Sequence, residues 1–240
     1  GDPGESRFYL SLEDNLMRIF NGERIQKIMT MLNIPEDEPI THKMVTNAIE
    51  GAQRKVEGHH FDVRKHLLDF DNVMNLQRNA IYKMRRQILE GKEIERSLLD
   101  MLGDVVSVIL DTHVPVDAKA QDWNLDGLNT ALLAQFGFQL DLATNPTIEK
   151  IQNDITTRVK KIFEHQKNSM GPYFERISKM IMLNAIDQRW KEHLYTLDKV
   201  KEGINLRAYG QKDPLIEYKK EAFKAFEYLN NAIKSETVEK

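Results

Sequence analysis

The sequence contains no cysteine, which excludes disulfide bonds and thiolate metal sites and fits a reducing compartment. No apolar run approaches the roughly 18 residues that a membrane-spanning helix needs, and no signal peptide is recognisable. The net charge of −3 gives no general attraction for nucleic acid or anionic lipid. With 41% hydrophobic and 30% charged residues, the chain of 240 residues is expected to fold as a soluble protein that binds no nucleic acid.

Motifs for catalysis and for cofactor binding are also missing. The sequence has neither the phosphate-cradling G-x-x-x-x-G-K-[ST] nor G-x-G-x-x-G. His59 and His60 point to different sides of a helix, and so do the carboxylates of Asp69 and Asp71, so neither pair forms a metal or acid–base site. We therefore expect no catalytic, cofactor or metal residues in this chain. It opens on Gly1 without a methionine, which indicates a piece of a longer protein.

No proline falls between Pro39 and Pro115, so nothing in that interval forces a helix to end. Apolar residues recur there in steps of three and four, the helical spacing, which predicts one helix over 41–90. Fifty residues would span about 75 Å. A second apolar set predicts a strut covered on more than one side, and a long coiled coil is the alternative; the set comprises Phe61, Leu68, Val73 and Leu76.

Three shorter helices are predicted after Gly91, over 94–113, 125–136 and 147–169. Asn145 and Pro146 resemble the cap and first residue of the third. Acidic residues outnumber basic ones over 92–146, whereas basic residues prevail over 41–91, which indicates a domain boundary near residue 91. Trp123 is interpreted as a core anchor of this small helical subdomain.

Two further amphipathic helices, over 173–204 and 215–233, are joined by residues 205–214. This pattern predicts an antiparallel helical hairpin. The last residues, 235–240, are expected to fray. The fold class is therefore all-α, with one very long helix, a small helical subdomain and a long hairpin.

The hairpin tip carries a large aromatic residue, Tyr209, between the cations Arg207 and Lys212. Loops often carry function, and a tyrosine can contact many peptides through its ring or its hydroxyl. One hypothesis is that this tip contacts a partner chain. The alternative is that the tip folds back and packs Tyr209 under Leu206.

Several motifs in order resemble the SecA family. Segments 52–57, 61–65 and 75–78 are similar to its long scaffold helix. Segments 190–194 (WKEHL) and 206–214 (LRAYGQKDP) are similar to its two-helix finger, with Ala208 and Gly210 exchanged relative to the usual tip. Residues 1–10 resemble the tail of its second nucleotide-binding domain. The resemblance extends from Gly1 to about Phe226.

SecA is an ATP-driven motor that pushes unfolded preproteins through the bacterial SecY channel. The resemblance implies that Tyr209, Arg207 and Lys212 contact the substrate. It also implies that the finger is supported by Trp190, Leu206 and Pro214. The implied domains are the nucleotide-binding tail (1–20), the helical scaffold (21–91, with the helix 41–90), the helical wing (92–165) and the scaffold continuation with the finger (166–240, tip 205–214).

The resemblance implies no cofactor in this chain, and ATP with magnesium in the parent protein. The expected partners are the SecY complex, unfolded preprotein, the protein's own nucleotide-binding domains and a second copy of the chain. The expected location is the cytoplasm, peripherally at the inner face of the plasma membrane. The alternative function is a passive helical module that holds partner domains or self-associates. A nucleotide-hydrolysing enzyme is the third class.

Overall fold

The structure is a computed structural model that describes residues 3–5, 9, 27, 30–31, 43–91, 93–141, 147–207 and 213–239. It comprises two compact units, Gly1–Asp71 and Asn72–Lys240. Over the described ranges the regular elements are helices and no strand occurs, which confirms the all-α fold. In that part of the chain no helix combines the length and the apolar character needed to cross a membrane.

The predicted long helix is present as α3, Lys43–Glu90, 48 residues without interruption. Its end has a local cause at Gly91, which adopts the left-handed conformation (φ 72°) that glycine favours. The Gly91 amide donates to the carbonyl oxygen of Ile88 at 3.0 Å and closes the last turn. A proline-free, periodic sequence with a glycine stop therefore produced the helix expected from it.

The second apolar set on α3 departs from expectation. Phe61, Leu68 and Leu76 are exposed to 59%, 57% and 72%, and only Val73 of that set is half-buried. The prediction that a second layer covers these residues is therefore wrong for this chain, because its described helices leave that side of α3 in solvent. The buried side of α3 within Asn72–Lys240 is a single stripe that includes Ile81 and Ile88.

The small helical subdomain contains α4 (Ile94–His113), α5 (Leu125–Phe136) and α6 (Ile148–Met170), the first two with the predicted bounds. A 3₁₀ turn, η1 (Ala120–Asp122), precedes Trp123, which packs half-buried against the core as expected. The predicted cap of α6 was wrong. Thr147 lies in extended backbone and its side chain accepts from the Lys150 amide, whereas Asn145 and Pro146 lie outside the described residues.

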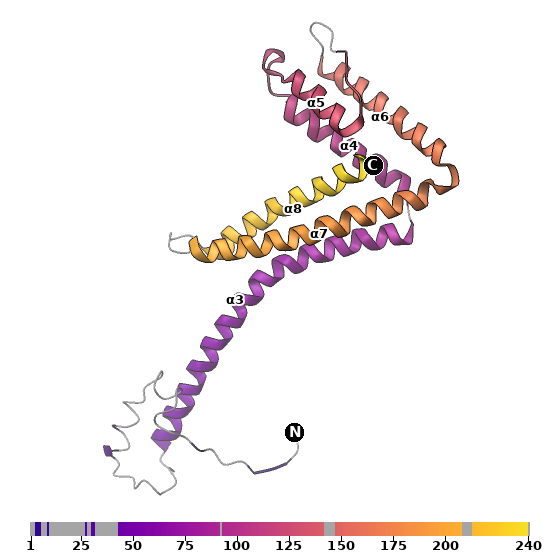
Figure 1. Cartoon of the computed structure of the whole chain (residues 1–240). Coiled ribbons are helices and arrows are strands. Elements are labelled where there is room, and N and C mark those ends of the chain that lie inside the picture. The colour runs from indigo at the N-terminus through magenta and orange to yellow at the C-terminus, as the bar shows by residue number, and fades with distance from the viewer. Residues whose placement is uncertain are drawn as a thin grey trace. The chain divides into compact units, whose positions relative to one another are not determined.

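The hairpin consists of α7 (Phe174–Arg207) and α8 (Pro214–Glu239), side by side and antiparallel (Figure 1). A 3₁₀ turn, η2 (Gly171–Tyr173), which contains Pro172, separates α7 from α6. The Asp213 carboxylate accepts from the Leu215 amide at 2.8 Å and caps α8. The expected fraying after residue 234 is wrong as far as Glu239, because Glu236 and Thr237 are buried against the rest of the fold.

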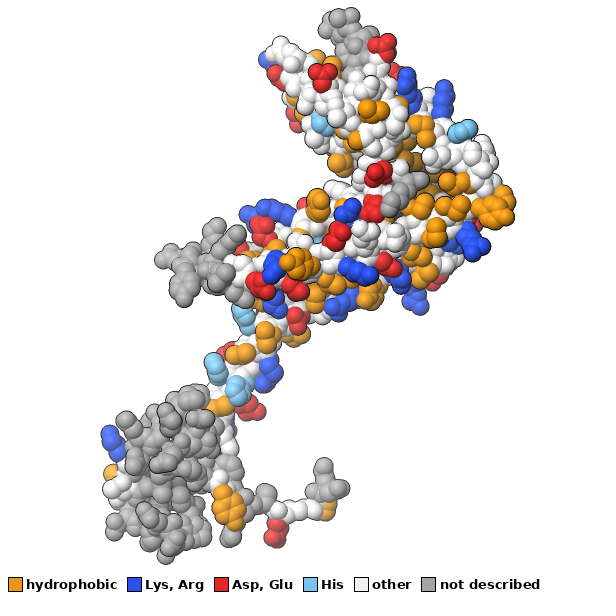
Figure 2. Space-filling view, viewed as in Figure 1, with side chains coloured by type: hydrophobic (Ala, Val, Ile, Leu, Met, Phe, Trp, Pro, Cys, Tyr) orange, Lys and Arg blue, Asp and Glu red, His pale blue; other side chains and the backbone are white. Residues whose placement is uncertain are grey.

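One hydrophobic core within Asn72–Lys240 joins α3, the small subdomain and the hairpin. Leu128 and Leu132 of α5 are fully buried in it, and Ile81 of α3 and Ile186 of α7 are only 1% exposed. The hairpin therefore does not stand alone: its base shares packing with α3 and with the helices α4–α6. Charged side chains of both signs are interspersed over the visible face of α7 and α8 (Figure 2).

Candidate functional site: the hairpin and its anchors

The structure describes only part of the predicted substrate-contacting tip. Tyr209 and Lys212 lie outside the described residues, and so do the side chains of Leu206 and Arg207, although the backbone of both belongs to the last turn of α7. Pro214 is the first residue of α8 and is half-buried. The roles assigned to the tip residues therefore stay predictions.

Trp190, expected to support the finger, lies buried in the shared core on α7. Its ring centroid is 5.5 Å from that of His193 in a tilted arrangement. The His193 ring is in turn 5.9 Å from Phe226 of α8. This row of rings connects the two helices of the hairpin where they pack against each other, and the supporting role of Trp190 stays a prediction.

A buried polar network links α3 to both hairpin helices. The Gln77 amide nitrogen Nε2 donates to the carbonyl oxygen of Ala222 on α8 at 3.0 Å. Its Oε1 lies 2.8 Å from His193 Nε2, which must donate because Oε1 can only accept. Burial lowers the pKa of His193 to about 4, so the ring is neutral at pH 7 and one nitrogen carries the donated proton.

Sequence reasoning missed this network although a signal existed. Gln77 interrupts the apolar stripe of α3 between Met74 and Ile81, at helical spacing from both. A polar residue in a buried stripe needs a hydrogen-bond partner, so Gln77 predicts a polar group on the element that packs against this face of α3. The partner itself, His193, lies 116 residues later and could not be identified without the fold.

A second connection between α3 and α7 is an ion pair at the surface. The Arg85 guanidinium donates to both carboxylate oxygens of Asp187, from Nε at 2.9 Å and from Nη2 at 3.1 Å. The two side chains are 43% and 46% exposed, so water competes for the same groups. This two-pronged pair therefore adds orientation to the contact, and less stability than a buried link.

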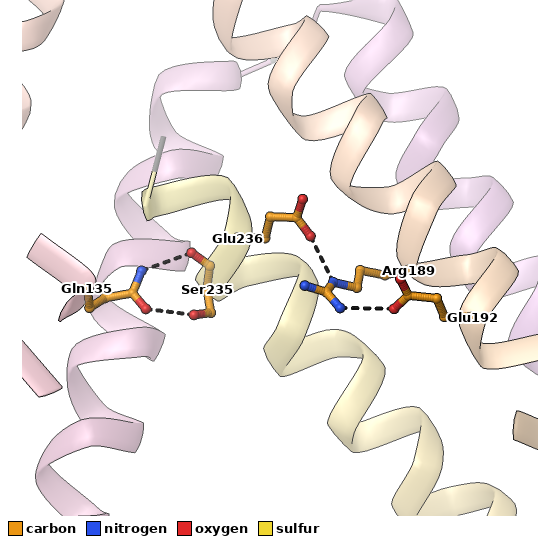
Figure 3. Close-up of polar contacts among 5 residues, drawn as sticks. All are labelled: Gln135, Arg189, Glu192, Ser235 and Glu236. Atoms are coloured by element: carbon orange, nitrogen blue, oxygen red, sulfur yellow. Dashed lines mark hydrogen bonds and ion pairs between the residues drawn. The ribbon is translucent and has the colours of Figure 1, made fainter.

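Polar contacts also hold the C-terminal end of α8, which forms the base of the hairpin (Figure 3). Arg189 of α7 donates to Glu236 at 2.8 Å and to Glu192 at 2.9 Å, and these two hydrogen bonds raise the pKa of Arg189 above its usual range. Gln135 of α5 donates to the carbonyl oxygen of Ser235 at 2.9 Å and accepts from its hydroxyl at 2.6 Å. The base of the hairpin is thus bound to the small subdomain as well as to itself.

We expect Arg189→Met to lower the free energy of unfolding by about 2 kcal/mol, because it leaves the mostly buried carboxylate of Glu236 without this cation. Urea denaturation followed by circular dichroism measures the loss. The double variant Arg189→Met, Glu236→Gln should regain part of it, since no charge is then buried. Arg86→Met, which removes an 82% exposed partner of Glu90, is the matched control and should change stability by less than about 0.5 kcal/mol. A similar loss in both single variants would contradict this assignment.

These contacts position helices; they do not form a catalytic constellation. Within the described residues no group of three His, Asp or Glu side chains could hold a metal ion. The arrangement is an antiparallel helical arm, held on a long helix by a buried amide and braced at its base by a small helical subdomain. Such a fold defines a class of all-helical domain in which a long helix supports an antiparallel helical hairpin.

Comparison with known proteins identifies the particular family. The SecA Wing and Scaffold domain matches residues 39–240, and the SecA P-loop domain matches residues 1–37. The chain is 68% identical to a protein translocase subunit SecA of Bdellovibrio bacteriovorus. The aligned part is 100% of this chain and 27% of the relative. The chain is 45% identical to a protein translocase subunit SecA of Syntrophus aciditrophicus, over 100% of this chain and 29% of the relative. The chain belongs to the SecA family and spans under a third of the length of these relatives.

Proposed function

We propose that this chain is the scaffold, wing and two-helix-finger region of a SecA-type motor, which couples ATP hydrolysis to movement of unfolded preproteins through the SecY channel. The family match over residues 39–240 supports the assignment of the region. The wing corresponds to 92–165 and the finger to the α7–α8 hairpin. ATP and magnesium bind elsewhere in the full-length protein, which acts in the cytoplasm, peripherally at the membrane.

The observation that carries this proposal is the attachment of the hairpin to α3. Gln77 contacts both hairpin helices, and Arg85 pairs with α7 eight residues further along α3. A helix held at several points transmits displacement, whereas a flexible linker absorbs it. Motion received by α3 therefore reaches the tip, where Tyr209, Arg207 and Lys212 contact the substrate and Leu206 and Pro214 support them.

In the full-length protein, Tyr209→Ala should lower the rate of preprotein transport by roughly 2- to 10-fold, the factor expected for an aromatic contact of about 0.5–1.5 kcal/mol. Nucleotide binding should remain unchanged. Transport of a labelled preprotein into SecY-containing vesicles measures the effect. Tyr228→Ala is the matched control, since Tyr228 is an exposed tyrosine on α8, 14 residues or about 21 Å from Pro214. Unchanged transport in Tyr209→Ala would refute the role of the tip.

The rival function is a passive module that only holds partner domains. A photo-cross-linking residue at position 209 separates the two in a complex with a stalled preprotein. Adducts with the preprotein support the proposed contact, and adducts only with neighbouring domains of the motor support the rival.

The exposed apolar residues of α3 have a place in the same proposal. Phe61, Leu67 and Leu68 lie within Gly1–Asp71, the unit that contains the P-loop match. The relatives are more than three times longer than this chain. We assign these side chains to contacts with the protein's own nucleotide-binding domains, with a second copy of the chain as the alternative occupant.

A further inference from the structure

A single side chain, Gln77, contacts both helices of the hairpin. Its Nε2 donates to the Ala222 carbonyl on α8 and its Oε1 accepts from His193 on α7. Gln77 is 8% exposed and His193 is 4% exposed, so water has little access to either end of the network. The amide therefore joins three helices through its two polar atoms.

This geometry fixes the axial position of the hairpin on α3. One residue corresponds to about 1.5 Å along a helix, and a donor–acceptor distance of about 3.0 Å tolerates little lengthening before the hydrogen bond is lost. A slide of the hairpin by two residue positions would therefore break both bonds at once. Because the site is buried, water would not replace them, and the broken groups would stay unpaired.

The Arg85–Asp187 pair cannot impose the same restriction. Both of its side chains are nearly half exposed, so water satisfies their charged groups when they separate. The long side chain of Arg85 also follows a small slide by changing its rotamer. The buried amide, and not the ion pair, distinguishes one axial position from its neighbours.

We propose that Gln77 is a positioning residue that locks the register between α3 and the hairpin, so that the two move as one body during transport. This inference rests on the proposed function and specifies how motion passes through the chain. It excludes a mechanism in which the finger slides along the scaffold helix. Movement must then enter through α3 as a whole, or through other domains of the full-length protein.

The test compares two Gln→Met variants of the full-length protein. Gln77→Met keeps the volume and removes both hydrogen bonds of the lock. Gln135→Met removes the same pattern, one donated and one accepted hydrogen bond, at the base of the hairpin near Ser235. The measurement is the number of ATP molecules hydrolysed per preprotein transported. A variant that only reduces the amount of folded protein lowers the rate of ATP hydrolysis and the rate of transport in proportion, and it leaves that ratio unchanged.

We expect Gln77→Met to raise the ratio roughly threefold or more, since each lost hydrogen bond shifts the locked population by up to about tenfold. Gln135→Met should leave the ratio unchanged. If Gln77→Met does not fold, the double variant Gln77→Met, His193→Phe provides the answer, because no side chain of the network is then left unpaired. An unchanged ratio in whichever of these variants folds overturns the register lock. Failure of the unmodified protein to transport preprotein overturns the proposed function instead.

Discussion

Replacement of Trp190 by Ala is expected to lower the free energy of unfolding by about 3–5 kcal/mol, the range for removing a buried tryptophan. Trp190 lies in the core shared by α3, the small helical subdomain and the hairpin, and its ring is close to that of His193. The change leaves a cavity that the neighbouring side chains fill only in part. Urea denaturation of the chain, followed by circular dichroism, measures the loss.

Two controls make the result specific. Trp190→Phe keeps an aromatic ring and should lose less than half as much. Tyr173→Ala removes an exposed aromatic side chain in η2 and should change stability by less than about 0.5 kcal/mol. Equal losses for Trp190→Ala and Tyr173→Ala would show that Trp190 does not anchor the hairpin.

Stability is expected to fall by about 3 kcal/mol as the pH drops from 6.5 to 4, through the titration of His193 alone. Burial lowers the pKa of His193 to about 4, below the 6.5 of an exposed histidine, so between these values the unfolded chain binds the proton and the folded chain does not. The stability is therefore complete above pH 6.5 and is lost as the pH falls. Unfolding free energies at several pH values measure this.

The appropriate comparison separates His193 from the carboxylates that titrate in the same range. His193→Phe removes the titration, so its free energy of unfolding should fall by about 3 kcal/mol less than that of the wild type over this pH interval.

The groups that face the ring, Gln77, Trp190 and Phe226, do not titrate, although the charged Arg189 and Glu192 line the same small cavity. His165→Gln, at an exposed position on α6, is the control for replacing a histidine and should change the stability at pH 7 by less than about 0.5 kcal/mol. Parallel curves for wild type and His193→Phe would contradict the assignment.

Much of the fold could be predicted because local signals and packing agree in this chain. The bounds of α4 and α5 follow from apolar residues at helical spacing, with glycine or Val-Pro at their ends. The wrongly predicted cap of α6 shows that such signals do not always locate the first residue of a helix. Asn145-Pro146 and Thr147 are both good starts, and only the extended backbone at Thr147 decides between them.

The candidate site could be predicted only in part. Trp190 was identified from a motif and is buried, and its supporting role stays a prediction. Gln77 and His193 were missed because their pairing depends on which face of α3 meets the hairpin, a property of tertiary packing. The same limit explains Phe61, Leu68 and Leu76: periodicity shows that a side chain is apolar, but not whether this chain contains the element that covers it.

The length of α7 beyond its anchored base has a geometrical consequence. Arg189, where the hairpin pairs with Glu236, lies 18 residues before Arg207, the end of α7, or about 27 Å away along the axis. If α3 and the hairpin tilt together as one body by about 10° about this point, the end of α7 is displaced by about 5 Å. One residue of an extended polypeptide measures about 3.5 Å, so a small rotation moves the end of α7 by more than the length of one extended residue.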